Sequence, residues 1–216
     1  VNRERMVEFR EHFELMHATI MANCNREMLR RTNRDRPIKA CVIFYSYSGI
    51  TRGVAEGIRN ASGCDLIEVK TKNPYSSFSV YTTGVLHSRK GACDPIEPEV
   101  IDVSGYDFLI IGTPVWAWKP SPAINAAVRA LKGCEGKMAV IFTTCSNQPG
   151  EALPMLRKAL SHRGVRVMAE VSLDAKDTRN PDAGGELLRQ ILGSDPLRAF
   201  VRGTPGDQQD ERDVKS

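Results

Sequence analysis

Short apolar or alternating runs are interleaved with segments of helical periodicity from residue 38 to residue 192. Such runs, bounded by turn residues, predict strands, and there are five of them, at residues 41–45, 65–69, 106–112, 137–142 and 165–173. Apolar residues at steps of three and four predict helices that end near Ser62 and that cover residues 122–131, 151–161 and 185–192. This alternation predicts an α/β fold with a doubly wound, five-stranded parallel sheet.

The beginning of the chain is patterned differently. Residues 3–31 carry one apolar stripe at helical spacing, formed by Met6, Phe9, Phe13, Met16 and Ile20. Residues 33–37 are polar and end this predicted helix. The stripe packs either on the chain's own domain or on a second subunit. We favour a homodimer through the N-terminal helix, because the predicted sheet is complete without it.

Three regions follow from these boundaries: an N-terminal helix with a basic linker, a main domain, and a polar tail that we expect to be disordered, at residues 1–36, 37–200 and 201–216. Within the main domain, residues 76–105 form a long, weakly patterned connection with a short predicted helix at 79–89. Connections of this length are often functional.

Composition argues against several classes of function. The formal net charge is +4, and residues 26–39 carry this excess without the interleaved aromatic residues of a nucleic-acid surface, so no nucleic-acid partner is expected. No apolar run is long enough for membrane insertion, and no signal peptide opens the chain. The six cysteines include no C-x-x-C pair. We therefore expect a cytoplasmic protein with reduced thiols and no metal site.

Candidate chemistry begins at Ser46-Tyr47-Ser48-Gly49-Ile50-Thr51, directly after the first strand and at the start of a helix. A helix N-terminus directs backbone N–H groups and a positive dipole end at one point, which suits a phosphate. The glycine permits close approach of the backbone, and the hydroxyls offer further hydrogen bonds. The alternative is an ordinary N-cap by Ser48 or Thr51.

Two more distinctive loops are predicted, after the third and fourth strands. The first holds both tryptophans of the chain, Trp116 and Trp118, between prolines, and the second reads Thr144-Cys145-Ser146-Asn147. Packing of both tryptophans over the core is the alternative to an exposed role. Ligands of such sheets bind outside the carboxyl ends of the strands, so the three loops are expected to meet at one edge.

These loops resemble those of the flavodoxin family, from about residue 38 to residue 192. The phosphate loop of that family reads [ST]-x-[ST]-G-x-T, and the tryptophan and Thr-Thr-Cys loops are also similar to those of flavodoxin-like proteins. The resemblance implies FMN as the cofactor and residues 37–200 as an FMN-binding domain. It implies phosphate contacts from Ser46, Tyr47, Ser48, Gly49, Ile50 and Thr51. It implies ring contacts from Pro114, Val115, Trp116, Ala117 and Trp118, and pyrimidine contacts from Thr144, Cys145, Ser146 and Asn147.

Other proteins of this architecture fit less well. Response-regulator receivers need acidic residues after the first strand, where this chain has Tyr45 and Ser46. Tyrosine phosphatases need C-x5-R; Arg52 has the right spacing, but Ser46 replaces the nucleophilic cysteine. A receiver-like or structural role is the non-redox alternative.

Among flavoproteins, two kinds of redox chemistry are open. One is a one-electron carrier that serves a redox partner protein, and the other is an oxidoreductase that passes electrons from reduced nicotinamide to a quinone or similar small-molecule acceptor. In flavodoxins the residue after the ring-stacking Trp is often Gly, whose peptide turns over on reduction. Ala117 occupies this position, and a left-handed conformation costs such a residue about 1–2 kcal/mol more than Gly. This favours the second kind.

Overall fold

The computed structural model describes residues 38–76, 85–89 and 91–192 of the chain. The predicted N-terminal helix with its linker, the boundaries near residues 36 and 200 and the polar tail lie outside these ranges. So does the first part of the short helix expected at residues 79–89. Its remainder is α3 (Val85–Arg89).

Five parallel strands form the central sheet, in the order β2–β1–β6–β9–β10. They are β1 (Ala40–Phe44), β2 (Asp65–Glu68), β6 (Phe108–Trp116), β9 (Met138–Thr144) and β10 (Arg166–Leu173). All five predicted strands are present and parallel, which confirms the flavodoxin-like sheet. From β1 the chain first adds β2 on one side and then β6, β9 and β10 on the other, so the switch point of the sheet lies between β1 and β6.

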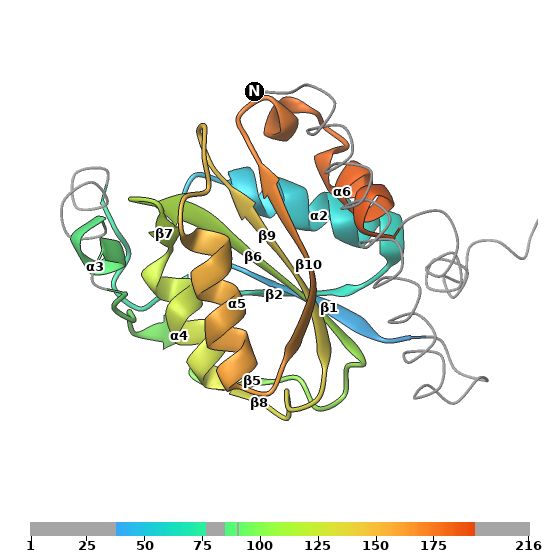
Figure 1. Ribbon diagram of the computed structural model, residues 1–216, viewed down its shortest axis with the longest axis horizontal. Helices are drawn as coiled ribbons and strands as arrows, with labels where there is room; N and C mark the ends of the chain where they lie inside the picture. Colours follow the sequence, from blue (N-terminus) through green and yellow to red (C-terminus); the bar gives the residue numbers. More distant parts are fainter. Residues whose placement is uncertain (1–37, 77–84, 90, 193–216) are drawn as a thin grey trace, which may run out of the picture. The chain divides into compact units, whose positions relative to one another are not determined.

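Helices cover both faces of the sheet (Figure 1). The helices α4 (Pro122–Ala130) and α5 (Ala152–His162) lie on one face, and α2 (Ile50–Ser62) and α6 (Ala183–Leu192) lie on the other. Alternate residues of the buried strands supply the core under α4 and α5, among them Cys41, Ile43, Leu109 and Ile141. This double burial explains the nearly continuous apolar runs.

The pair α2 and α6 pack with their backbones in contact. A Cβ atom at Gly184 would lie 2.4 Å from the backbone nitrogen of Ile58, and one at Gly57 would lie 3.0 Å from Gly184 Cα. Only glycine permits this approach. The sequence pattern predicts that the last helix begins at Gly185. In the structure α6 begins two residues earlier, at Ala183, and so includes Gly184, which packs against α2.

The carboxyl edge of the sheet is stepped, because β1 ends earlier than its neighbours. Phe44 pairs with Gly112, and β6 then continues through Trp116, about 13 Å further at the usual rise per residue. The expectation that residues 113–116 and 143–144 are loop is wrong. These residues belong to strands because they pair with neighbouring strands. Pro114 pairs with Thr144 of β9, and β7 (Lys119–Pro120) folds back and pairs with β6 in antiparallel orientation.

Several short elements were not predicted. The strand β3 (Lys70–Thr71) pairs with β4 (Ile96–Glu97), and β5 (Ile101–Asp102) pairs with β8 (Leu131–Lys132). A 3₁₀ turn, η2 (Asp177–Arg179), follows β10. Two-residue strands are too short to show periodicity. No helix in the described part of the chain is both long and apolar enough to cross a bilayer.

Candidate functional site

The hydroxyl-rich turn joins β1 to α2 without a side-chain cap. The N-cap residue is Gly49, in the left-handed conformation at φ 88°, and no side chain hydrogen-bonds to the first turn of the helix from this position. Its own N–H donates to Ser46 Oγ at 3.1 Å. The alternative of an ordinary cap by Ser48 or Thr51 is therefore wrong. The first N–H groups of α2 are available to an external acceptor.

Thr51 connects the first predicted loop to the third. Its Oγ1 lies 2.8 Å from Thr144 Oγ1, and both residues are buried, at 1% and 5% exposure. The helix α2 begins one residue before Thr51, so this hydrogen bond fastens the first helical turn to the end of β9. The two loops predicted to hold phosphate and pyrimidine edge are joined by one buried contact.

Arg52, which follows Thr51, pairs with a carboxylate and does not point its guanidinium at the turn as the arginine of a phosphatase loop would. The Arg52 guanidinium donates to Glu68 at the end of β2 and forms an ion pair with it. A guanidinium engaged in this way is not free to close over an anion bound at the turn. Together with Ser46 in place of the nucleophilic cysteine, this disfavours the phosphatase reading.

The second predicted loop is a tight hairpin between β6 and β7. Trp116 pairs with Lys119, and the two residues between them, Ala117 and Trp118, have φ values of 48° and 65°. Two successive left-handed residues define the type I′ turn that normally uses Asn-Gly. Side chains with a Cβ are strained here, at about 1–3 kcal/mol each, and such strain clusters at functional sites.

Neighbouring segments hold the hairpin in this conformation. Ser88 Oγ contacts two backbone carbonyls of the hairpin, Trp116 O at 2.7 Å and Pro120 O at 3.0 Å. The Glu151 N–H donates to Trp118 O at 2.8 Å. A Cβ at Gly150 would lie 2.4 Å from Trp118 Cβ, so the turn packs directly on the residues before α5.

The two tryptophans have different surroundings. Trp116 is half-buried, and three tyrosine rings meet it edge-on, with centroid distances of 5.8 Å for Tyr45, 6.1 Å for Tyr47 and 5.2 Å for Tyr75. Edge-to-face pairs at these distances are favourable. Trp118 is 60% exposed. We call Tyr45, Tyr47, Tyr75 and Trp116 the aromatic cluster. Its Tyr47–Trp116 contact joins the first predicted loop to the second.

The rest of the third loop is held less tightly. The Cys145 N–H donates to Leu173 O at 2.9 Å, and Cys145 Sγ lies 3.6 Å from Ser172 Oγ. Ser146 and Asn147 are exposed. The structure thus brings Tyr47, Thr51, Trp116 and Thr144 together. It leaves Ser48, Ile50, Ser146 and Asn147 at the surface of the same sheet edge, with Pro114, Val115 and Ala117 half-buried beside them.

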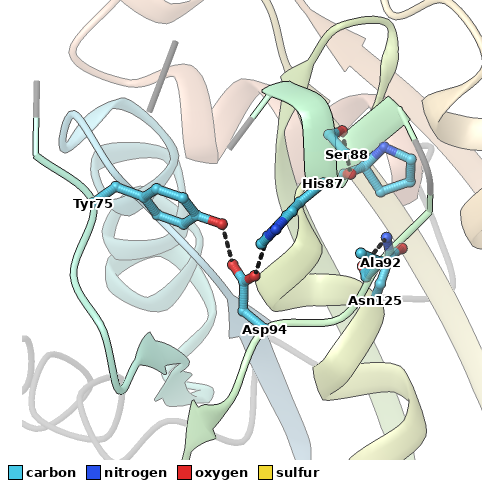
Figure 2. Close-up of polar contacts among 7 residues, drawn as sticks. Tyr75, His87, Ser88, Ala92, Asp94 and Asn125 are labelled. Atoms are coloured by element: carbon cyan, nitrogen blue, oxygen red, sulfur yellow. Dashed lines mark hydrogen bonds and ion pairs between the residues drawn. The ribbon is translucent and has the colours of Figure 1, made fainter. Parts of the chain in front are cut away.

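Sequence reasoning missed a polar group beside the aromatic cluster (Figure 2). The Tyr75 hydroxyl donates to Asp94 Oδ2 at 2.6 Å, and His87 Nδ1 lies 3.2 Å from Asp94 Oδ1. Burial raises the pKa of Tyr45 to about 12, and burial together with Asp94 raises the pKa of Tyr75. His87 and Asp94 lie within residues 76–105, whose weak pattern indicated only a functional connection.

These features fit a phosphorylated, planar cofactor. The N-terminus of α2 has no side-chain cap, and a Cβ added at Gly49 would meet nothing within 4 Å, so space is open at the turn. Trp116 and the exposed Trp118 lie on the neighbouring hairpin. The described residues contain no group of three His, Cys, Asp or Glu side chains that could hold a metal ion.

Comparison with known proteins agrees with this geometry. Residues 39–163 match a family model described as flavodoxin. No curated protein is significantly similar to the chain. Among solved structures, a protein from Bacteroides eggerthii DSM 20697 that is assigned as a flavoprotein shares 23% identity at a TM-score of 0.57, covering 72% of this chain and 99% of that one.

Two further structures show the same fold. A flavoprotein from Lactobacillus acidophilus NCFM, in complex with FMN, shares 22% identity at a TM-score of 0.55, covering 66% of this chain and 97% of that one. A protein from Bacteroides uniformis ATCC 8492, also assigned as a flavoprotein, shares 16% identity at a TM-score of 0.59, covering 70% and 99%. With the family match spanning more than half of its length, the chain belongs to the flavodoxin family.

Proposed function

We propose that this protein binds FMN and acts as an oxidoreductase that passes electrons from a reduced donor to a quinone or a similar small acceptor. The observation that carries the proposal is the junction of the three loops at one edge of the sheet. The Thr51–Thr144 hydrogen bond joins the first and third, and the Tyr47–Trp116 contact joins the first and second. The family match supports the same cofactor.

The phosphate is assigned to the turn and the first turn of α2. Backbone N–H groups there, with the hydroxyls of Ser46, Ser48 and Thr51, offer the donors that a phosphate dianion requires. Ser46 Oγ already accepts the Gly49 N–H, so its role is to shape the turn as well as to face the ligand. FMN fits this single cradle better than FAD, which would need a second phosphate site.

The flavin ring is assigned to the hairpin and the end of β9. Trp116 and its neighbours Pro114, Val115 and Ala117 supply apolar contact, and Trp118 is exposed enough to cover a ring face. Backbone groups from Thr144 to Asn147 supply polar contacts to the pyrimidine edge. When bound, FMN itself supplies the electron-transfer chemistry, so the protein needs no catalytic acid or base of its own.

A small acceptor is favoured over a protein acceptor by the hairpin. Ala117 and Trp118 both carry a Cβ and occupy the left-handed region. A turn-over of the peptide at Ala117, of the kind that stabilises the one-electron form in flavodoxins, is harder for such residues than for Gly, and this favours two-electron chemistry with a small acceptor. The one-electron carrier remains the alternative within the family. Its partner would be a redox protein.

The first experiment identifies the cofactor. The protein is purified, the released cofactor is identified by mass spectrometry, and the apoprotein is titrated with FMN, FAD and riboflavin. We expect FMN, and weaker binding of riboflavin because it lacks the phosphate. Finding FAD, or no flavin after reconstitution, would refute the proposed cofactor.

The second experiment addresses the acceptor. Steady-state oxidation of reduced nicotinamide is measured with a soluble quinone, and an anaerobic reductive titration counts the electrons per step. Quinone turnover and a single two-electron step support an oxidoreductase. Two resolved one-electron steps without quinone turnover would indicate a carrier.

A further inference from the structure

A buried carboxylate contacts the aromatic cluster through Tyr75. Asp94 is 9% exposed, and its two oxygens contact different partners: Oδ2 accepts from the Tyr75 hydroxyl at 2.6 Å, and Oδ1 lies 3.2 Å from His87 Nδ1. Figure 2 shows the carboxylate between the two rings. The His87 side chain is 42% exposed. We call these three residues the Tyr75–Asp94–His87 network.

The segments that carry the network are also hydrogen-bonded to the hairpin and to α4. Ser88, next to His87, contacts the carbonyl oxygens of Trp116 and Pro120, so α3 is fixed to β6 and β7. Asn125 of α4 donates from Nδ2 to Ala92 O at 3.2 Å, which anchors the segment leading to Asp94. The contact between Asn125 and Ala92 is also visible in Figure 2. The segments that carry His87 and Asp94 are therefore fixed to the hairpin and to α4.

The hydrogen bond of the Tyr75 hydroxyl helps to fix the position of its ring. The ring meets Trp116 edge-on at a centroid distance of 5.2 Å, the shortest of the three tyrosine contacts of Trp116. A hydrogen bond from a phenol to a buried carboxylate is among the stronger kinds. Releasing it would free the Tyr75 side chain, and with it one of the supports of Trp116.

The negative charge of Asp94 affects the pKa values of two tyrosines in the aromatic cluster. It contributes, after burial, to raising the pKa of both Tyr75 and Tyr45. Each of these effects means that a negative charge on the neighbouring group is disfavoured. A buried negative charge also opposes the gain of electron density at a nearby ligand.

We propose that Asp94 is a positioning residue of the flavin site, which acts through Tyr75 to hold Trp116 in place and through its charge to lower the midpoint potential of bound FMN. This inference rests on the proposed function. The contacts assign each residue a distinct part: Tyr75 transmits position, Asp94 supplies position and charge, and His87 forms the solvent-exposed end.

The test separates position from charge with two variants. Tyr75→Phe keeps the ring and removes the hydrogen bond, whereas Asp94→Asn keeps an oxygen that can accept from Tyr75 and removes the charge. For Tyr75→Phe we expect FMN affinity to fall about tenfold and the near-ultraviolet circular dichroism of the apoprotein to change, because the support of Trp116 is lost. For Asp94→Asn we expect a higher midpoint potential with FMN affinity changed less than in Tyr75→Phe.

The size of the potential shift follows from linkage. A tenfold change in the ratio of the affinities for reduced and oxidised FMN corresponds to about 30 mV for a two-electron couple. A matched control is the pair of Tyr106 and Asp65 at the opposite edge of the sheet, where the Tyr106 hydroxyl donates to Asp65 Oδ2 at 3.0 Å. Tyr106→Phe and Asp65→Asn should leave FMN affinity and midpoint potential at wild-type values.

The outcomes are distinguishable. If the wild-type protein binds no FMN, the proposed function fails. If it binds FMN, but Tyr75→Phe and Asp94→Asn match their controls in affinity, potential and near-ultraviolet circular dichroism, the inference fails and the proposed function stands. Should Asp94→Asn not fold, Tyr75→Phe alone decides, since loss of affinity supports positioning and wild-type affinity contradicts it.

Discussion

Replacing Thr51 by Val removes one hydroxyl from a buried pair and leaves the other without a partner. Thr51 Oγ1 and Thr144 Oγ1 are 2.8 Å apart, and the two residues are 1% and 5% exposed. A hydroxyl pair of this kind contributes about 0.5–1.5 kcal/mol, but a buried group left unpaired costs about 1–3 kcal/mol. We therefore expect Thr51→Val and Thr144→Val each to lower the free energy of unfolding of the apoprotein by about 1–3 kcal/mol.

The double variant gives the sharper result. When both hydroxyls are replaced by methyl groups, no unpaired group remains, and the cost should be close to zero. The changes in the free energy of unfolding are then non-additive by more than about 1 kcal/mol. Urea denaturation followed by circular dichroism measures this, with a midpoint shift of about 0.5–1.5 M for each single variant. Additive effects in the double variant would contradict the proposed pairing.

Ligand binding adds a second comparison. Thr51 lies in the first turn of α2, whereas Thr144 lies at the end of β9. If Thr51 serves the phosphate, Thr51→Val should weaken FMN by about tenfold or more and riboflavin very little, since a hydrogen bond to a charged group is worth about 1.5–3 kcal/mol. Thr144→Val is the matched control and should affect both ligands alike. Equal losses for FMN and riboflavin in Thr51→Val would place the phosphate elsewhere.

Four further predictions follow from other features. Ala117→Gly should raise the free energy of unfolding by about 0.5–1 kcal/mol, because relief of the left-handed strain exceeds the entropy cost of glycine; an unchanged urea midpoint would argue against strain. Gly150→Ala should lower it by about 1–3 kcal/mol and change tryptophan fluorescence, since the new Cβ would lie 2.4 Å from Trp118 Cβ at a φ of 56°. Burial raises the pKa of the Cys41 thiol to about 12 from 9.0, so the unfolded chain loses this proton first. Its contribution to stability is complete below pH 9 and is lost as the pH rises to 12, by roughly 1.4 kcal/mol per pH unit. Cys41→Ala should reduce the dependence of the free energy of unfolding on pH by this amount, measured by urea unfolding at several pH values. Deletion of residues 1–33 should convert a dimer into a monomer that keeps its flavin, and a monomeric full-length protein in light scattering would contradict this.

Periodicity was informative wherever an element is long and buried. The runs that became β1, β6 and β9 are apolar because helices cover both of their faces, and this leaves a strong pattern in the sequence. The position of the hydroxyl-rich turn was also predictable, because it follows the apolar run of β1 and precedes the helical spacing of α2. For Thr51 and Thr144 the sequence predicted only that their loops lie close together. It could not predict the hydrogen bond between them, because partners 93 positions apart leave no local pattern.

The parts that sequence reasoning missed depend on tertiary contacts. The extension of β6 to Trp116 requires β7 to fold back on it, through a turn whose Ala-Trp sequence does not resemble the usual Asn-Gly. The Tyr75–Asp94–His87 network joins residues on separate segments that have little regular structure of their own. Nothing in the spacing of these residues indicates that one carboxylate serves both rings.

The extension of β6 past the end of β1 limits how the site can change in length. If residues 113–116 were a loop, they would tolerate insertions. They are instead part of a strand that pairs with β9 at Pro114 and with β7 at Val115, so their register is defined. One residue added after Gly112 would place Val115 where Trp116 now stands and would reverse the face of each following side chain. Variation among natural relatives or engineered forms should therefore occur by substitution within β6 and by insertion after Thr144, where the strand has ended.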